Sequence, residues 1–431
     1  MDSSTTRPLN ITVVGAGIGG LAAAIALRRS GNRVKIFESS PHNTEFGAGI
    51  SLQNNSLRIL NAWGFLRENL NSVSFDGINI RDAVTGEGHS VTFPHLEQAK
   101  AKAINALTCQ RNDLLEELKR LAVGDNDCPG PPAELYFDSK VVSCDTEAGS
   151  ITLESGEAVA ADLVIGADGI HSTIRPSILG ESVTADTTGL SCFRCLLDAT
   201  KVADHPTLSW LNEGIEAPWN ITTVEGSHFS SFMVYFVRKR ELLNLVAYYH
   251  DRHREGKCPF DRRGRGASNE SRYPGSFSYF SAEFETLLDL PTVPTTASPT
   301  GILRWQLPAM PLLSTWVKGR AMIMGDAAHS TLPTSGRAGI AIEEAVTLGV
   351  LFPLGTTGDE VSERLEAFQE LCKGRGDLVN SESVARVDST QKKTMSDREL
   401  QVYLVARDAI KTAEEYSRLH FDAAPSHGDV D

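Results

Sequence analysis

A strand, a glycine turn and a helix near the start of the chain constrain its fold most. Residues 11–14 read as a short buried strand, and residues 15–20, Gly-Ala-Gly-Ile-Gly-Gly, follow directly before an Ala- and Leu-rich helical run. In such a turn Gly15 makes the tight bend, Gly17 lets the backbone approach a pyrophosphate, and Gly20 lets helix and strand pack closely. The phosphates then lie at the positive end of the helix.

An acidic residue stands where a dinucleotide-binding fold needs one. Val34 to Phe37 reads as a second strand, and Glu38 ends it. A carboxylate at this place can accept hydrogen bonds from both hydroxyls of an adenosine ribose. Glycine-rich turns alone are common, but this strand, helix and acid together predict a nucleotide site in a Rossmann-like α/β fold.

Size and charge limit the other possibilities. The 431 residues exceed one ordinary core, so we expect two or more domains. The formal net charge of −14 argues against a nucleic acid or a membrane surface as partner and favours a small molecule. Without a signal-like start or a long apolar run, the expected compartment is the cytoplasm. Cys192 and Cys195 are interpreted as core thiols on opposite faces of a strand, and no metal site is expected.

Two later strands also end in an acid and a glycine loop. An apolar strand leads into Ala167-Asp168-Gly169, and residues 320–324 lead into Gly325-Asp326 and a helix. Ligands collect outside the carboxyl ends of parallel strands, so both acids are expected near the ligand of the first motif. Asp326 can hold polyol hydroxyls, and the amides that open the helix can hold negative charge. Asp-Gly is also a common turn dipeptide, which leaves a structural role open for Asp168.

Two shorter signals allow more than one interpretation. Gly47-Ala48-Gly49 at the start of an extended segment suggests backbone close to something flat, although a hairpin or bulge explains this stretch alone better. Arg111 near a helix start could meet a phosphate or be a surface arginine. Farther along, residues 189–249 are rich in β-branched and aromatic side chains, which predicts an antiparallel sheet in a second domain. The stretch Arg252 to Ser276 is interpreted as a solvated loop.

The first fingerprint and the late acid-plus-helix unit imply one long cofactor, and FAD fits. With these motifs the chain resembles the FAD-dependent aromatic hydroxylases, which are single-component flavoprotein monooxygenases similar to salicylate hydroxylase. It looks closest to the fungal branch that hydroxylates or dearomatises phenolic polyketides. The resemblance covers most of residues 10–400 and rests on Gly15 to Gly20, Glu38, Gly47 to Ile50, Arg111 to Leu114, Gly166 to Gly169 with Arg175, and Gly325 to His329 with Pro333.

The resemblance implies a role for each matching residue. It assigns the cofactor to Gly15, Gly17, Gly20, Glu38 (ribose), Gly49 (flavin), Arg111 (pyrophosphate), Asp168 (FAD and NAD(P)H), Asp326 (ribityl chain), and Ala338 and Gly339 (isoalloxazine). Arg194 and Tyr235 match an arginine and a tyrosine that face the substrate in the fungal branch. His329 is expected to stabilise its loop. The segment Ser335 to Gly339 is one residue shorter than the family pattern and carries an arginine.

The implied fold is α/β, with a Rossmann-like FAD-binding domain similar to that of para-hydroxybenzoate hydroxylase, an antiparallel-sheet substrate domain and C-terminal helices. The expected boundaries are residues 1–72, 100–188 and 301–360 for the FAD-binding domain, 73–99 and 189–300 for the substrate domain, and 361–431 for the helical region.

The implied reaction is a monooxygenation. NAD(P)H reduces FAD, O₂ reacts with the reduced flavin, and one oxygen atom passes to an electron-rich carbon of a small aromatic substrate. Arg194 can hold a phenolate and Tyr235 can donate to it. An ion-paired strand arginine and a core tyrosine are the alternatives. For the whole chain, the alternatives are a flavin dehydrogenase, oxidase or epoxidase, a flavin-free NAD-dependent reductase, and a non-catalytic scaffold. A monomer or homodimer is expected.

Overall fold

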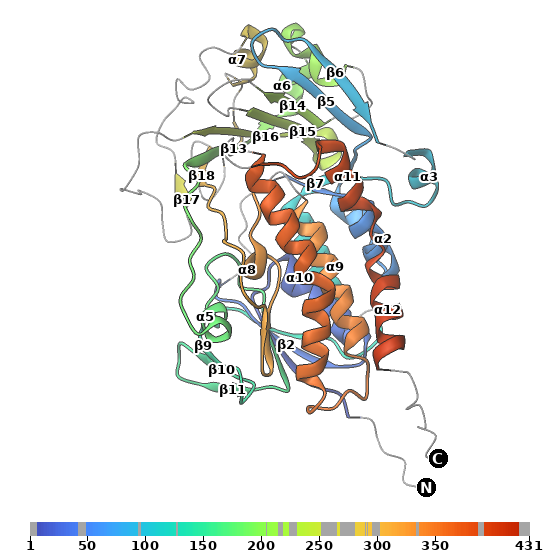
Figure 1. The fold of residues 1–431 in the computed structure, drawn as a ribbon. Coiled ribbons are helices and arrows are strands. Elements are labelled where there is room, and N and C mark those ends of the chain that lie inside the picture. The colour runs from blue at the N-terminus through green and yellow to red at the C-terminus, as the bar shows by residue number, and fades with distance from the viewer. Residues whose placement is uncertain are drawn as a thin grey trace.

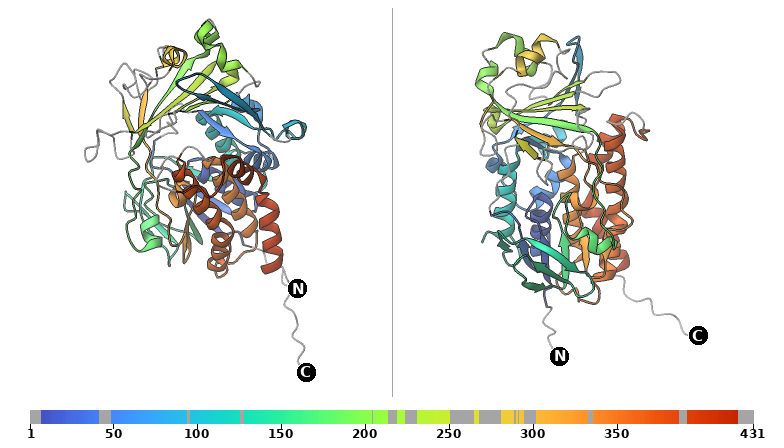
Figure 2. Two further views of the ribbon diagram at one scale, coloured as in Figure 1. Left: turned by 45° about the horizontal axis from the view of Figure 1, so that its top comes forward. Right: turned by 90° about the vertical axis from the view of Figure 1, so that its left-hand side faces the viewer.

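The computed structural model describes residues 7–41, 49–93, 96–125, 128–203, 205–213, 219–223, 231–250, 265–267, 281–288, 290, 292–294, 302–332, 336–386 and 392–421. Two sheets organise these residues. A large sheet lies across one end of a half that is built from a parallel sheet and helices, and Figures 1 and 2 show this arrangement from three directions. The expected combination of a Rossmann-like α/β half, an antiparallel sheet and C-terminal helices is confirmed.

The parallel sheet brings the three acid-bearing motifs to one edge. Its strand order is β19-β20-β12-β1-β2-β8, and every pair except β19–β20 is parallel. Because β1, β2, β12 and β20 are neighbours that run the same way, the loops after them meet at their carboxyl ends. The strands are β1 (Asn10–Val14), β2 (Arg33–Phe37), β8 (Glu134–Tyr136), β12 (Leu163–Gly166), β19 (Val317–Lys318) and β20 (Ala321–Ile323).

Helices pack around this sheet. The nearly fully buried α1 (Ile18–Arg29) contacts α4 (Arg111–Val123) and α9 (Arg337–Leu351). Helix α9 also contacts α2 (Asn54–Ala62), α10 (Val361–Ala385) and α12 (Ala409–His420), and Figure 1 shows α9, α10 and α12 side by side. The other elements of this half are α5 (Arg175–Leu179), α8 (Asp326–His329), α11 (Asp397–Ala406), η1 (Arg67–Leu70), β9 (Val141–Asp145), β10 (Ser150–Leu153) and β11 (Ala158–Ala160).

The large sheet has the strand order β17-β18-β13-β16-β15-β14-β5-β6, and its pairs are antiparallel except β14–β5. One face forms a core with the short helices α6 (Ala199–Ala203), η2 (Pro206–Asn212) and α7 (Ala282–Leu288). The strands are β5 (Gly77–Asp82), β6 (Gly88–Thr92), β13 (Leu190–Asp198), β14 (Trp219–Thr223), β15 (Ser231–Val237), β16 (Leu242–His250), β17 (Arg265–Ala267) and β18 (Leu303–Gln306).

The opposite face of this sheet meets the other half through a small antiparallel sheet of β3 (Gly49–Leu52), β7 (Leu107–Gln110) and β4 (Val73–Ser74). Cys192 and Cys195 lie buried in the clusters on opposite faces of β13, as their spacing on a strand predicts. The remaining short helices are α3 (Leu96–Ala101) and η3 (Arg238–Arg240).

Two segments pair differently from the sequence-based interpretation. Strand β18, expected to open the last part of the FAD-binding domain, pairs with β13 and β17 in the large sheet. Of the stretch Arg252 to Ser276, only residues 265–267 are described, and they form strand β17 instead of a loop. Both strands are short, and pairing with a distant strand leaves no local signal. The domain boundaries remain a proposal.

Among the helices of the described residues, none combines the length and the apolar character that a bilayer span requires.

Candidate functional site

Glycine is needed at Gly15, Gly17 and Gly20 for three different physical reasons. Gly15 has φ +100°, and a Cβ there would lie 2.6 Å from the carbonyl oxygen of Ala167. A Cβ on Gly20 would lie 1.9 Å from the carbonyl oxygen of Gly15, so this glycine lets α1 pack on β1. A Cβ on Gly17 would meet no protein atom within 4 Å. Gly15 and Gly20 are therefore required by the protein itself, whereas Gly17 leaves room for a ligand at the start of α1.

Glu38 lies at this helix start. The backbone N–H of Ala16 donates to Glu38 Oε2 at 2.8 Å, and the N–H of Ser40 donates to Oε1 at 2.8 Å. Gly15 N–H also donates to the carbonyl of Phe37, which ties the glycine turn to the end of β2. A carboxylate has more acceptor sites than these bonds use. Glu38 is thus fixed in place and can still accept hydrogen bonds from ribose hydroxyls.

The Asp168 loop packs on the same turn, and one oxygen of its carboxylate, Oδ2, serves the loop, whereas the buried Oδ1 has no hydrogen-bond partner among the described residues. Oδ2 of Asp168 accepts from the backbone N–H of Thr173 at 2.6 Å and from the Thr173 hydroxyl at 3.0 Å. Burial raises the pKa of Asp168, while these hydrogen bonds act in the opposite direction. The backbone of Asp168 faces Gly15, whose added Cβ would approach the Asp168 Cα to 3.0 Å. These contacts support the turn role, and a direct contact of the carboxylate with a cofactor stays a prediction.

Arg175 joins this loop to the segment that carries Asp326. It is buried, and its Nη2 donates to the carbonyl of Ile170 at 2.8 Å while Nη1 donates to the carbonyl of Ala327 at 3.0 Å. Ile170 belongs to the Asp168 loop, and Ala327 belongs to α8, which begins at Asp326. One arginine therefore holds both acid-bearing segments at a fixed separation.

Positive charge gathers around Asp326. Arg337 Nη1, at the start of α9, lies 3.3 Å from Asp326 Oδ2. Burial lowers the pKa of Arg111 to about 10. The Asp326 carboxylate opposes this shift, and the Arg337 and Arg194 cations reinforce it. The Arg337 and Arg194 cations thus both lie close enough to Arg111 to act on its charge, which suits a site for anionic groups.

The starts of three helices converge beside these charges. A Cβ added to Gly19 of α1, or to Gly325 before α8, would lie 3.6 Å from the Cβ of Ala341 in α9. Ala338 and Gly339 form the first turn of α9, and a Cβ on Gly339 would lie 3.1 Å from Nδ2 of Asn55. Residues 333–335 of the shortened loop lie outside the described residues. The helix starts of α1 and α9 offer backbone N–H groups to anions.

Arg194 and Tyr235 lie on the sheet face that meets the cofactor half. Cross-strand pairs place Cys192 beside Tyr248 and Trp305. The guanidinium of Arg194 lies over the Trp305 ring, 5.8 Å from its centroid, and the buried Nε has no hydrogen-bond partner. Within the described parts of the chain Arg194 makes no hydrogen bond or ion pair with protein, so the ion-paired alternative finds no support there.

Two tyrosines flank this arginine. Tyr235 and Tyr248 are both 4% exposed. Burial raises the pKa of both phenols, although the Arg194 cation acts in the opposite direction. Both hydroxyls are therefore protonated at neutral pH and can donate a hydrogen bond. A cation, two phenolic O–H groups and an indole on one apolar face suit a planar, aromatic anion.

Gly49 is one of the residues through which the two halves meet. Its N–H donates to Asn244 Oδ1 at 2.8 Å, and an added Cβ would lie 2.7 Å from Cε2 of Tyr235. Residues 46–48 lie outside the described residues. The close approach inferred from the glycines is to a tyrosine ring of the large sheet, and β3 pairs with β7 without forming a tight hairpin. A contact between Gly49 and the flavin stays a prediction.

A family profile described as an FAD binding domain matches residues 9–383. The chain belongs to this FAD-binding family. The chain is 35% identical to hispidin-3-hydroxylase of Neonothopanus nambi over 392 residues, covering 88% of the chain and 89% of that relative. It is 30% identical to the FAD-dependent monooxygenase cfoG of Aspergillus candidus over 374 residues, covering 86% and 83%.

Solved structures agree with this assignment at the level of the fold. CtdE in complex with FAD and substrate superposes with a TM-score of 0.76 at 22% identity, covering 95% of this chain and 98% of that one. A salicylate hydroxylase substrate complex gives a TM-score of 0.74 at 22% identity with the same coverage. The expectation of an FAD-dependent monooxygenase of the fungal, salicylate hydroxylase-like type is confirmed.

FAD is the cofactor of this family, and the residues present fit it. The fingerprint leaves room for a pyrophosphate at Gly17, Glu38 can accept from the ribose, and Asp326 lies at the second unit. NAD(P)H as co-substrate is typical of the family.

The sequence reasoning missed four residues of the substrate face and its border: Asn244, Tyr248, Trp305 and Arg337. The first three belong to strands whose neighbours come from distant segments. Arg337 stands out in the sequence only as a departure from the family pattern, although an arginine at a helix start is a usable signal.

Proposed function

We propose that the protein hydroxylates, or oxidatively dearomatises, a small phenolic substrate with NAD(P)H and O₂, in fungal secondary-metabolite biosynthesis. The reaction consumes one NAD(P)H, one proton and one O₂. It adds one oxygen atom to the substrate and releases NAD(P)⁺ and water. The relatives that carry monooxygenase and hydroxylase names, at 35% and 30% identity, support this class of reaction.

The observation that carries the proposal is the environment of Arg194. A guanidinium is always charged, and leaving it half-buried without a carboxylate costs free energy in the ligand-free protein. Here it lies over Trp305, with its Nε buried and unpartnered. An anionic aromatic ligand would complete its hydrogen bonds. A phenolate is such a ligand.

FAD, when bound, supplies the oxygen chemistry, and the residues of this chain bind and orient the reactants. The glycine turn and Glu38 hold the adenosine end of the cofactor, and Arg111 is proposed to lie on its pyrophosphate. Arg194 holds the phenolic oxygen as an anion, which makes the ring carbons more electron-rich. Tyr235 and Tyr248 donate hydrogen bonds that orient this oxygen, and the apolar face around them excludes water.

The test is product mass spectrometry with a panel of phenols and polyketide aromatics under ¹⁸O₂. We expect a product that carries one ¹⁸O atom and NAD(P)H oxidation that depends on the substrate. A product that has lost two hydrogens without gaining oxygen would instead establish the alternative, a flavin dehydrogenase or oxidase on the same scaffold. Epoxidation also adds one oxygen and is separated from hydroxylation by NMR of the product.

Arg194→Ala tests the substrate-binding role, with Arg304→Ala as the matched control. Arg304 belongs to the neighbouring strand and lies over Phe193 and Tyr249, on the opposite face of the sheet. We expect Arg194→Ala to keep its FAD and lose at least about a hundredfold in kcat/KM, since a charge-assisted hydrogen bond and its orientation are lost. Unchanged turnover in Arg194→Ala would remove this residue from the mechanism.

The proposed compartment is the cytoplasm, where NAD(P)H is supplied, and the proposed assembly is a monomer or homodimer. Size-exclusion chromatography with light scattering measures the second directly.

A further inference from the structure

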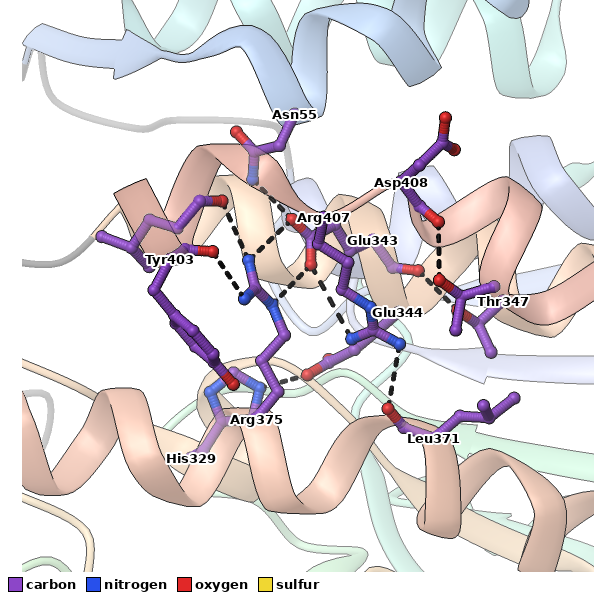
Figure 3. Close-up of polar contacts among 12 residues, drawn as sticks. Asn55, His329, Glu343, Glu344, Thr347, Leu371, Arg375, Tyr403, Arg407 and Asp408 are labelled. Atoms are coloured by element: carbon purple, nitrogen blue, oxygen red, sulfur yellow. Dashed lines mark hydrogen bonds and ion pairs between the residues drawn. The ribbon is translucent and has the colours of Figure 1, made fainter. Parts of the chain in front are cut away.

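Two consecutive glutamates of α9, Glu343 and Glu344, are almost fully buried. Buried carboxylates are costly unless hydrogen bonds and opposite charges compensate them. Side chains of adjacent helical residues point in different directions. Each of these two carboxylates therefore finds its partners on a different side of α9, as Figure 3 shows.

Glu343 faces α2 and the C-terminal helices. Its Oε1 accepts from Asn55 Nδ2 at 2.6 Å and from Arg375 Nη2 at 3.0 Å, and its Oε2 accepts from Arg375 Nε at 2.7 Å. Arg407 Nη1 lies 3.9 Å from Oε2. Gly339 is one turn earlier on α9 and packs on the same Asn55 side chain. This cluster thus lies directly behind the first turn of α9.

Arg375 is itself held by the next helix. Its Nη1 donates to the carbonyl of Tyr403 at 3.1 Å and its Nη2 to that of Leu404 at 2.9 Å, both in α11. Its guanidinium also lies 4.8 Å from the centroid of the Tyr403 ring. With Nε and both Nη atoms engaged, the guanidinium has one orientation. The position of Glu343 is therefore set by helices α10 and α11 at the far end of the sequence.

Glu344 faces the other side. Its Oε2 accepts from the backbone N–H of Gly325 at 2.8 Å, and its Oε1 is hydrogen-bonded to Nε2 of His329. The His329 ring stacks on Trp316 with centroids 5.0 Å apart. Gly325 and His329 bracket α8, so this carboxylate fixes the segment that presents Asp326.

We propose that Glu343 and Glu344 form a double clamp that positions the flavin end of the cofactor site. Through Glu344 the clamp fixes the Asp326 segment, and through Glu343 it fixes the first turn of α9 against Asn55. Arg375 connects the clamp to the C-terminal helices. These helices, which contribute no residue to the predicted contacts with FAD, are then positioning elements for it. The inference rests on FAD as cofactor and not on the identity of the substrate.

Burial of an ion pair is a poor source of stability, because desolvation offsets much of the attraction. A bidentate pair supplies orientation instead, since both partners are planar and each has few alternative geometries. This argues that the pair serves the geometry of the site and not mainly the folding free energy.

The experiment compares Arg375→Lys with Arg364→Lys. Both arginines are buried in α10 and bond to α9, but Arg364 donates to the carbonyl of Leu351 at the opposite end of that helix. Each full-length variant is titrated with FAD, with flavin fluorescence as the readout, and its Tm and flavin midpoint potential are measured. We expect Arg375→Lys to raise the Kd for FAD at least about tenfold relative to Arg364→Lys and to shift the midpoint potential.

Asn55→Ala gives a second, independent test, because it leaves the Glu343–Arg375 pair in place. We expect weaker FAD binding and an altered flavin absorption spectrum with a small loss in Tm. The proposal is overturned if Arg375→Lys and Arg364→Lys weaken FAD binding equally, or if Asn55→Ala keeps the wild-type Kd and midpoint potential.

Discussion

The cofactor end and the substrate face of this molecule are specified in different ways. At the cofactor end, most requirements lie within one strand–turn–helix–strand unit: Gly20 packs on the carbonyl of Gly15, and Glu38 accepts the N–H of Ala16, although Gly15 also packs on the Asp168 loop. On the substrate face, Arg194, Tyr248 and Trp305 come from three strands and meet only because the strands pair in one register.

Substitutions in the two regions are therefore expected to change different properties of the protein. A fingerprint residue affects the helix start it belongs to, so its effects concern folding and FAD. A residue of the large sheet contributes a side chain to a shared surface, so its effects concern the substrate. Gly49, which packs on Tyr235, lies where the two regions meet.

The largest effect is expected for Gly20→Ala. The new Cβ would lie 1.9 Å from the carbonyl oxygen of Gly15, so α1 must move away from β1. Overpacking of this kind costs about 3 kcal/mol of folding free energy. Urea unfolding of the FAD-free protein measures this cost. An unchanged midpoint would show that the helix–strand contact is looser than described.

Gly17→Ala separates folding from cofactor binding. Its backbone angles, φ −71° and ψ −177°, suit any residue, and no protein atom lies within 4 Å of the new Cβ. We expect the FAD-free protein to keep its stability within about 1 kcal/mol and the Kd for FAD to rise at least about tenfold, because the pyrophosphate can no longer approach the backbone. Isothermal titration calorimetry measures the Kd for FAD. A wild-type Kd in Gly17→Ala would show that the phosphates of FAD do not lie at Gly17.

Gly49→Ala tests the border between the regions. The added methyl would lie 2.7 Å from the Tyr235 ring and 2.8 Å from Cγ of Asn244, so both side chains must shift. We expect KM for the substrate to rise about tenfold together with weaker FAD binding, since one methyl disturbs both sides. Steady-state kinetics and FAD titration are compared with those of Gly17→Ala. An effect on FAD alone would show that Tyr235 does not face the substrate.

Tyr248→Phe is expected to affect the substrate face alone. The ring keeps its packing beside Cys192, and only the hydroxyl is lost. Removal of one hydrogen bond to the phenolate anion costs about 1.5 kcal/mol, which corresponds to roughly tenfold in kcat/KM. FAD affinity should stay at the wild-type value. If FAD binding falls as well, the tyrosine lies nearer the cofactor than the substrate.

The smallest expected effect is a pH dependence of stability that arises from the Glu344–His329 pair. Burial lowers the pKa of His329, but the Glu344 carboxylate, with a smaller contribution from Asp326, more than offsets this, so the net pKa is raised. A raised pKa stabilises the protein below the unfolded value of about 6.5 and the contribution is lost as pH rises through the folded pKa. We expect the Tm of the wild type to fall modestly as the pH rises through the folded pKa of His329, and we expect no such fall in His329→Gln. Parallel profiles of Tm against pH in the two proteins would exclude the His329–Glu344 pair as the source.

The sequence alone indicates the cofactor end more directly than the substrate face, for a physical reason. A glycine turn, its helix and the acid at Glu38 are local, so their spacing is visible in the chain. The choice of Arg194 and Tyr235 came from the family resemblance, and their neighbours Tyr248 and Trp305 could not be found because cross-strand pairing is non-local. The resemblance assigns the Asp168 carboxylate to the cofactor, and this stays a prediction, because the hydrogen bonds of its Oδ2 lie within its own loop. The Glu343–Arg375 pair joins residues that are 32 positions apart, and no motif in the sequence indicates it.

The most direct test of the account is a crystal structure of the protein with FAD and a phenolic ligand. We expect one continuous cofactor, with its adenosine ribose on Glu38, its ribityl chain at Asp326 and its flavin ring next to the phenolic oxygen held by Arg194. A structure in which the Glu38 and Asp326 carboxylates face separate cavities, or in which the ligand lies away from Arg194, would contradict the proposed site.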